Sequence, residues 1–208
     1  MSDDKGSKGT GSLLRNPLPL RPQIDRANRE IAVLVSRLNQ AESRVKSRDQ
    51  EMFRKVVLSV QKGDRERAAI YATELIQVRR LGTTVSVALL ALEQVSLRLA
   101  TVTELGEVAA TLAPTVAVVK SIGTGLGSLM PDAKGQIDQI SSLLSTTLVE
   151  AGSVGCTSLN FQAANTEAEK VLEEAAGVAY ERVSSEFPEV PTLATLPTRD
   201  DEEEGLAI

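Results

Sequence analysis

The stretch Lys62–Leu81, "KGDRERAAIYATELIQVRRL", combines a turn, a cluster of charges and a run of small residues within twenty positions. Gly63 can adopt a positive φ angle after one helix, and Asp64 can cap the start of the next. Three alanines follow between positions 68 and 72, where a core helix usually carries Leu or Ile. Helices that reverse at a tight turn are closest just beyond it, and alanines allow their backbones to approach. The stretch therefore predicts the turn of an antiparallel helical hairpin, with its four arginines covering the outside.

The segment before this turn has the pattern of one long helix. It contains no Gly or Pro between Gln23 and Lys62, which gives a helix roughly 60 Å long at 1.5 Å per residue. Apolar residues recur at alternating spacings of three and four, a heptad seam that a partner helix can cover. The seam consists of Ile24, Ala27, Ile31, Leu34, Leu38, Ala41 and Val45.

A second helix follows the turn, with no Pro until Pro114 and with a seam of its own. That seam consists of Leu81, Val85, Ala88, Leu92, Val95, Leu99 and Val102. Two long helices with facing stripes form an αα-hairpin. The predicted fold class is all-α, a long antiparallel hairpin followed by shorter helices, in an open or a closed arrangement.

The rest of the chain is predicted as shorter helices and flexible segments. Leu105–Met130 contains Pro114 and several glycines, which favours short, flexible helical pieces. A helix over 134–150 has Ile137, Ile140, Leu144 and Leu148 on one face, and a last helix over 165–187 has Val171, Leu172, Ala175, Val178, Ala179 and Val183. The expected organisation is a flexible basic and apolar segment (1–22), a helical core (23–150), a linker (151–164), a C-terminal helix (165–187) and a disordered acidic tail with prolines (188–208).

The charges are divided unevenly along the chain. Residues 1–80 hold 17 Lys/Arg and 10 Asp/Glu, whereas residues 81–208 hold 6 and 18. Such an asymmetry can arise from solvated helix faces alone. It can also arise from a basic end that meets an anionic surface, or from opposite ends that attract within or between molecules.

Composition limits the class of protein. Aromatic residues make up 2% and Trp is absent, so the usual large core residues are scarce. The single Cys156 excludes an internal disulfide framework and fits a reducing compartment. No secretory signal begins the sequence, and no uncharged apolar run reaches the roughly 18 residues of a membrane span. We expect a cytoplasmic protein, soluble or peripheral on a membrane.

No residue pattern points to catalysis. The chain has no His, which removes the commonest general base and metal ligand. Cys156 therefore has no His to activate it, and "GTGLG" (Gly123–Gly127) lacks the strand and the Lys-Ser/Thr of a phosphate loop, so we interpret it as a flexible hinge. "DDEEE" (Asp200–Glu204) is interpreted as a solvated tail. We expect no enzyme activity, no cofactor and no metal site.

The basic N-terminal third is the strongest functional signal. Each cation near an anionic leaflet contributes about 1 kcal/mol, and nearby leucines can add an apolar wedge. A basic helix face in solution is the simpler alternative. Interleaved aromatics and known reader motifs are absent, so no nucleic acid is expected. The predicted membrane-binding residues are Leu13, Leu14, Arg15, Leu18, Leu20, Arg21, Arg26, Arg29, Arg37, Arg44, Lys46 and Arg48.

These features resemble the ESCRT-III (Snf7) family. "A-x-x-Y-A-x-E" after the hairpin turn, "LALEQVSLRLATVTELGEV" (Leu90–Val108) and "LMPDAKGQIDQISSLLSTTL" (Leu129–Leu148) carry the likeness, which covers roughly Ile24–Glu150. The run "L-E-Q-V-x-L-R-L" is similar to the archaeal cell-division (CdvB-like) branch. The chain ends soon after its last helix, as in a short paralogue without the winged-helix extension of one archaeal member.

The resemblance implies a filament subunit that assembles with itself and with paralogous subunits on anionic membrane at the division site. It implies subunit packing through Ala68, Ala69, Tyr71, Ala72, Glu74, Leu75, Leu92, Val95 and Leu99. It also implies acidic helices that can fold back and mask assembly, and an AAA ATPase whose MIT domain grips a C-terminal motif. The segment "VPTLATLP" only approximates that motif and is otherwise a Pro-rich spacer. Its candidate docking residues are Val190, Pro191, Leu193, Leu196 and Pro197.

The sequence thus leads to one hypothesis and one alternative. The hypothesis is an ESCRT-III-type polymer subunit that remodels or constricts membrane in cell division, on the inner face of the membrane. The alternative is a soluble helical coiled-coil scaffold or adaptor without direct membrane binding. The first predicts salt-sensitive liposome binding that is lost when Arg15, Arg21, Arg26 and Arg29 are replaced by Glu. The second predicts partner binding that is indifferent to this change.

Overall fold

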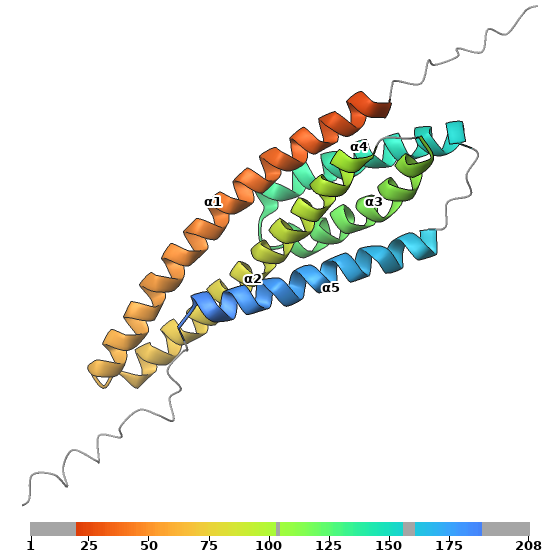
Figure 1. Ribbon diagram of the computed structural model, residues 1–208. Helices are drawn as coiled ribbons and strands as arrows, with labels where there is room; N and C mark the ends of the chain where they lie inside the picture. Colours follow the sequence, from red (N-terminus) through yellow and green to blue (C-terminus); the bar gives the residue numbers. More distant parts are fainter. Residues whose placement is uncertain (1–19, 103–104, 156–160, 189–208) are drawn as a thin grey trace, which may run out of the picture.

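The computed structural model describes residues 20–102, 105–155 and 161–188. These residues form helices joined by short connections, and no strand occurs among them. Helices α1 (Leu20–Gln61) and α2 (Arg65–Thr101) lie side by side and antiparallel as a long hairpin (Figure 1). The predicted all-α class and the hairpin are both confirmed.

The hairpin turn is built by hydrogen bonds that end one helix and begin the next. Gly63 has a φ angle of 70°, and its N–H donates to the Val60 carbonyl at 2.9 Å. The N–H of Asp64 donates to the Ser59 carbonyl at 2.9 Å, which completes a Schellman motif with Gly63 in its left-handed position. The Asp64 carboxylate then accepts the N–H of Arg67 at 3.0 Å and caps α2.

The two predicted seams face each other inside the hairpin. Every seam residue predicted for α1 is buried, and in α2 the seam from Val85 to Leu99 is buried as well. Leu81 and Val102, at the ends of the α2 seam, are half-buried. Among the described residues, those of α1 and α2 alone form a small separate core near the turn, around Met52, Val56 and Leu75.

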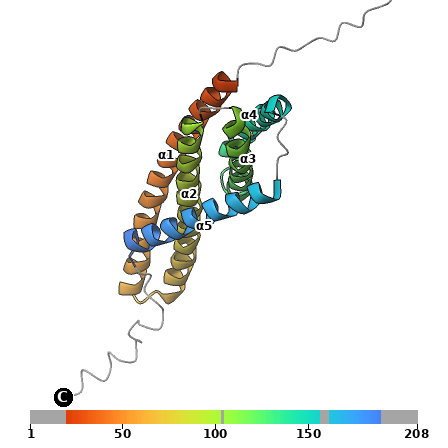
Figure 2. The same ribbon diagram turned by 45° about the vertical axis from the view of Figure 1, so that its right-hand side comes forward.

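A second hairpin and a crossing helix cover the other end of the first hairpin. Helices α3 (Leu105–Gly127) and α4 (Pro131–Gly155) pair with each other and pack against α2 and α1 respectively. Helix α5 (Phe161–Glu186) crosses α2 and α3 (Figures 1 and 2). The main core lies where these helices converge, so it is thickest away from the hairpin turn.

Residues 105–130 differ from the prediction. Residues 105–127 form one helix, α3, that runs through Pro114, so the prediction of short flexible pieces is wrong. The expected hinge at 123–127 is also wrong, since its glycines are helical. A Cβ at Gly123 would lie 2.9 Å from Cγ2 of Ile137, so this glycine permits close packing of α3 on α4. Tertiary packing thus overrides the low helix propensity of glycine.

Other boundaries shift by several residues. The second helix ends at Thr101, where Val102 takes an extended conformation, and does not continue toward Pro114. Helix α4 extends to Gly155 and α5 begins at Phe161, so most of the expected linker over 151–164 is helical, and residues 156–160 lie outside the described ranges. Val178, predicted on the apolar face of the last helix, is 49% exposed.

Helices α2 and α3 are long and apolar enough, by length and composition alone, to cross a membrane. Their most apolar windows are 44% and 61% buried inside the fold. Both helices supply residues to the main core.

The glycines of α3 provide a test of this packing. Gly123→Ala should lower the free energy of unfolding by about 1–3 kcal/mol, because the new methyl group would overlap the buried Ile137 side chain. Gly125→Ala is a matched control in the same helix turn, with nothing within 4 Å of the added Cβ. It should stabilise the protein by up to about 1 kcal/mol through helix propensity. Guanidinium unfolding followed by circular dichroism measures both, and equal effects would contradict the close contact between α3 and α4.

Candidate functional site

The first half of α1 presents four exposed arginines on its solvent side. Arg21, Arg26, Arg29 and Arg37 are exposed, and none has an ion-pair partner among the residues that the structure describes. Leu20 is half-buried and packs against the main core. The other predicted membrane-binding residues of the N-terminal segment, Leu13, Leu14, Arg15 and Leu18, lie outside the described ranges.

Farther along α1 the predicted membrane-binding cations are already engaged. Arg44 is exposed and donates to the Gln40 carbonyl of its own helix at 3.3 Å. Arg48 pairs with Glu51 at 3.0 Å, and hydrogen bonds from Lys55 and then Arg48 lower the pKa of Glu51. Lys46 is half-buried and pairs with Glu186 of α5 at 2.8 Å. Among the predicted membrane-binding cations, those with neither an ion pair nor a hydrogen bond in the described part of the chain are therefore Arg21, Arg26, Arg29 and Arg37, in the first half of α1.

The residues predicted to pack between subunits are largely occupied within this subunit. Leu92, Val95 and Leu99 are buried in the main core, and Leu75 is buried in the small core near the turn. Ala68 is also buried, Ala69, Tyr71 and Ala72 are half-buried, and Glu74 is exposed. Their role between subunits stays a prediction, and it requires the helices that cover α2 to move.

A buried ion pair joins α1 to α2 within the seam. Asp49 is 1% exposed, and its Oδ1 accepts a hydrogen bond from Nε of Arg79 at 2.7 Å. The two atoms of the pair without a partner are Asp49 Oδ2 and Arg79 Nη2, so the pair is only half satisfied. Sequence reasoning missed it and placed Arg79 with the other arginines on the outside of the arm. Arg65, Arg67 and Arg80 are exposed there, as predicted.

A signal for the pair is present in the sequence. After Val45 the next buried position of α1 is Asp49, four residues on, and Met52 and Val56 follow at three and four. The heptad stripe therefore continues through a carboxylate. An acidic residue at a seam position is almost never buried without a partner, which would have pointed to a cation on the facing helix.

The end of α5 reaches across the hairpin at the same level. The Phe187 ring lies 5.4 Å from the guanidinium of Arg79, and Gly82 of α2 leaves room beside Val45 and Phe187. Arg182 approaches Glu42 at 4.0 Å, and Glu42 accepts a hydrogen bond from the Ser86 hydroxyl at 2.9 Å. At the other end of α5, Glu167 pairs with Arg98 of α2.

These contacts follow the charges of the helices. Helix α1 contains nine Lys/Arg and five Asp/Glu, whereas α5 contains two and six. Opposite net charges favour the docking of α5 on the hairpin. A hydrogen bond from Lys46, with a smaller one from Arg182, lowers the pKa of Glu186, although partial burial opposes the shift. Glu186 is therefore ionised in the docked arrangement at neutral pH.

The described residues contain no group of three or more Asp, Glu, His or Cys side chains that could hold a metal ion. Cys156, the acidic run at 200–204 and the candidate docking residues Val190, Pro191, Leu193, Leu196 and Pro197 lie outside the described ranges. The described residues thus form an all-helical fold with a basic face on the first half of α1 and an acidic helix, α5, that packs on α2 and α3 and pairs with α1 only near its C-terminal end.

Comparison with known proteins agrees with this class. The chain is 36% identical over 173 residues to Cell division protein B1 of Sulfolobus acidocaldarius, covering 83% of this chain and 81% of that protein. It is 32% identical over 155 residues to Cell division protein B of the same organism, covering 74% of this chain and 59% of that longer protein. No family profile and no solved structure matches. The chain belongs to the family of ESCRT-III-like archaeal cell division proteins of the CdvB type.

The buried ion pair gives a stability prediction. Arg79→Met should lower the free energy of unfolding by about 3–5 kcal/mol, because it leaves the buried Asp49 carboxylate uncompensated. Arg80→Met, at the next, exposed position, should change it by less than about 0.5 kcal/mol. The double variant Asp49→Leu/Arg79→Met should recover most of the loss. Guanidinium unfolding measures all three, and similar effects of Arg79→Met and Arg80→Met would contradict a buried pair.

The docking of α5 should depend on pH. The lowered pKa of Glu186 means that its contribution is present above the ordinary glutamate pKa and is lost as the pH falls through the folded value. Amide hydrogen exchange at the end of α5, corrected for intrinsic rates, should therefore speed up at acidic pH. Glu186→Gln should show faster exchange already at neutral pH. Glu181→Gln, an exposed neighbour without an ion pair among the described residues, is the control and should exchange like the parent.

Proposed function

We propose that this chain is a filament-forming ESCRT-III-type subunit that assembles on anionic membrane and remodels or constricts it during cell division. The observation that carries the proposal is the set of exposed, unpaired arginines on the first half of α1, in a hairpin of this family. The relatives are named as cell division proteins. The location that we propose for this chain is therefore the division site, on the inner face of the membrane.

The free arginines supply the membrane contact in this proposal. Arg21, Arg26, Arg29 and Arg37 have no competing carboxylate partner among the described residues, so they can meet lipid phosphates without first breaking an ion pair. Each contributes about 1 kcal/mol near an anionic leaflet, and four together give about 4 kcal/mol. Screening by salt weakens this attraction beyond a Debye length of about 8 Å at physiological ionic strength.

Assembly in this proposal begins when the covering helices leave the hairpin. Helix α5 and the α3–α4 hairpin bury Leu92, Val95 and Leu99, the residues predicted to contact neighbouring subunits. Their release would expose this apolar stripe to a second copy or to a paralogous subunit. The end of α2 at Thr101 and the start of α3 at Leu105 lie only a few residues apart, and a merger of the two helices there would create a longer arm.

Disassembly is assigned to an AAA ATPase with an MIT domain. The proposed docking segment is 190–197, through Val190, Pro191, Leu193, Leu196 and Pro197. A sequence with prolines and regularly placed aliphatic residues suits a groove of a partner domain. The segment follows α5 directly, so an ATPase that pulled on it would act first on α5.

Liposome binding tests the proposal. The variant with Arg21, Arg26, Arg29 and Arg37 replaced by Glu should lose at least about a hundredfold in affinity for anionic liposomes, given about 1 kcal/mol per cation. Co-sedimentation at low and high salt measures the affinity, and binding by the parent protein should fall as salt rises. Electron microscopy of the same samples should show ordered filaments or coated tubes with the parent and bare vesicles with the variant.

The matched control reverses four exposed cations elsewhere: Arg65, Arg67, Arg80 and Lys120. It carries the same total charge as the test variant and should bind liposomes better than the test variant does. Equal loss in both variants would show attraction by net charge alone and would contradict a membrane face on α1. Filaments or partner binding that persist without lipid binding would favour the helical scaffold alternative.

A further inference from the structure

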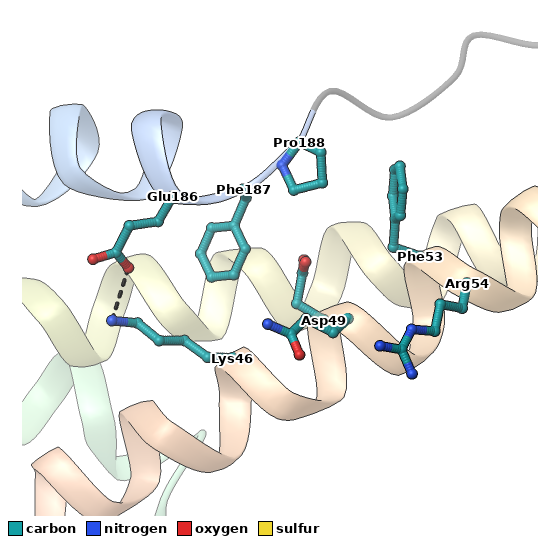
Figure 3. Close-up of a pocket in the computed structure, with 8 residues that line it drawn as sticks. Lys46, Asp49, Phe53, Arg54, Glu186, Phe187 and Pro188 are labelled. Carbon is teal, nitrogen blue, oxygen red and sulfur yellow. Dashed lines mark ion pairs between the residues drawn. The ribbon is translucent and has the colours of Figure 1, made fainter.

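A cavity of about 430 Å³ lies between α1 and the end of α5. Its floor comes from α1, with Lys46, Asp49, Phe53 and Arg54 among the lining residues, and Phe187 and Pro188 close it from the side of α5. In Figure 3 the ring of Phe53 stands up from α1 on the far side of Pro188 from Phe187. The volume falls within the roughly 300–1,000 Å³ of pockets that enclose a small ligand.

The lining has a definite chemistry. Phe53, Phe187 and Pro188 offer apolar rings, and the two phenylalanines are half-buried side chains that solvent still reaches. Lys46 and Arg54 add cations on either side. Lys46 is paired with Glu186, whereas Arg54 is exposed and has no hydrogen bond or ion pair within the described part of the chain. The cavity therefore suits a short segment with aliphatic or proline side chains and a carboxylate for Arg54.

We propose that this cavity binds residues 189–193 of the same chain, with Val190 and Pro191 against the Phe53 ring and the Glu189 carboxylate paired with Arg54. Pro188 is itself part of the lining, and the chain continues directly from it as Glu189, Val190, Pro191, Thr192 and Leu193. At about 3.3–3.6 Å per residue, Val190 and Pro191 can lie no farther than about 11 Å from Pro188. The residues that fit the cavity are thus the ones within reach of it.

The covalent link to Pro188 favours residues 189–193 over a separate molecule as the occupant of the cavity. A segment tethered by a short linker has an effective concentration in the millimolar range, so even a weak fit is populated. The following run at 200–204 is entirely acidic, which adds attraction toward a helix with nine cations and five carboxylates. A second copy of the chain offers the same segment, but only at its bulk concentration.

Docking of this segment would determine when it is available to another protein. Docked in the cavity, Val190 and Pro191 are not available to another protein, and the cavity loses its α5 side when the end of α5 leaves α1. Under the proposed function, on which this one consequence rests, the ATPase would reach its docking segment only in subunits whose α5 has been released. The docking itself does not depend on that function.

Fluorine NMR on the full-length chain, labelled with fluorophenylalanine, tests the docking. The chain has three phenylalanines, Phe53 and Phe187 at the cavity and Phe161 at the other end of α5. The double substitution Val190→Ser/Pro191→Ser should shift the Phe53 resonance, although Phe53 is distant in sequence, and should leave the Phe161 resonance in place. Leu196→Ser, a matched change outside the docked segment, should leave Phe53 unchanged.

Charge reversal supplies a second arm. In an Arg54→Glu background, the Val190/Pro191 substitution should no longer move the Phe53 resonance, because Glu189 has lost its partner and the segment is already released. In an Arg44→Glu background, with the same reversal ten residues earlier on α1, the shift should persist. If the Val190→Ser/Pro191→Ser substitution in the parent protein leaves the Phe53 resonance unchanged, the proposal is overturned. A shift that grows with protein concentration also overturns it and assigns the cavity to the tail of a second copy.

These measurements are made without lipid and below the concentration at which filaments form. A failure of docking would therefore leave liposome binding by α1 untouched, and a failure of liposome binding would leave the Phe53 result interpretable. The two proposals can be wrong independently.

Discussion

The pairing register of α1 and α2 is the constraint on which the rest of the structure depends. The Schellman turn at Gly63 and the cap at Asp64 set this register, because they fix where the first helix stops and the second begins. The Asp49–Arg79 pair then penalises any slip, since a shift of one residue would bury one charge without the other. Buried ion pairs add little net stability, and a role in specifying register is among their better attested uses.

Local sequence signals predicted the hairpin, but they could not predict contacts between helices that are distant in sequence. The hairpin was predictable because Gly63, Asp64 and two seams carry a local signal that agrees with the tertiary fold. The single helix α3 was not, because Gly123 and its neighbours read as helix breakers when their surroundings are unknown. At Gly123 the Ile137 side chain of α4 occupies the space that a larger residue would need, so this glycine serves the close packing of α3 on α4. The basic face of α1 was predictable from composition, whereas the partners of Lys46 and Arg79 come from helices far away in sequence.

Helix α5 is held less firmly than the hairpin of α1 and α2. Helix α1 buries Ile, Leu, Val and Met side chains against α2, whereas the residues that α5 buries are Ala164, Ala168, Val171, Ala175 and Ala179. An alanine removes far less apolar surface from water than a leucine, at about 0.8 kcal/mol for each buried CH₂ group. The ion pairs of α5 with Lys46 and Arg98 are partly exposed, and such pairs contribute about 0–1 kcal/mol each. The local release of α5 therefore costs less than separation of α1 from α2.

The weak anchoring of α5 connects the behaviour of the basic helix α1 with that of the acidic helix α5. The cations of α1 have two possible anionic partners, the acidic helix α5 and a membrane, and Lys46 cannot serve both at once because its ammonium lies 2.8 Å from Glu186. Under the proposed function, a membrane that attracted the free arginines near the start of α1 would also raise the local concentration of phosphates around Lys46. The membrane would then compete with Glu186 for the same cation, because any binding that is stronger in the released state shifts the population toward it. The weak apolar anchoring of α5 makes such a shift possible with a differential affinity of only a few kcal/mol.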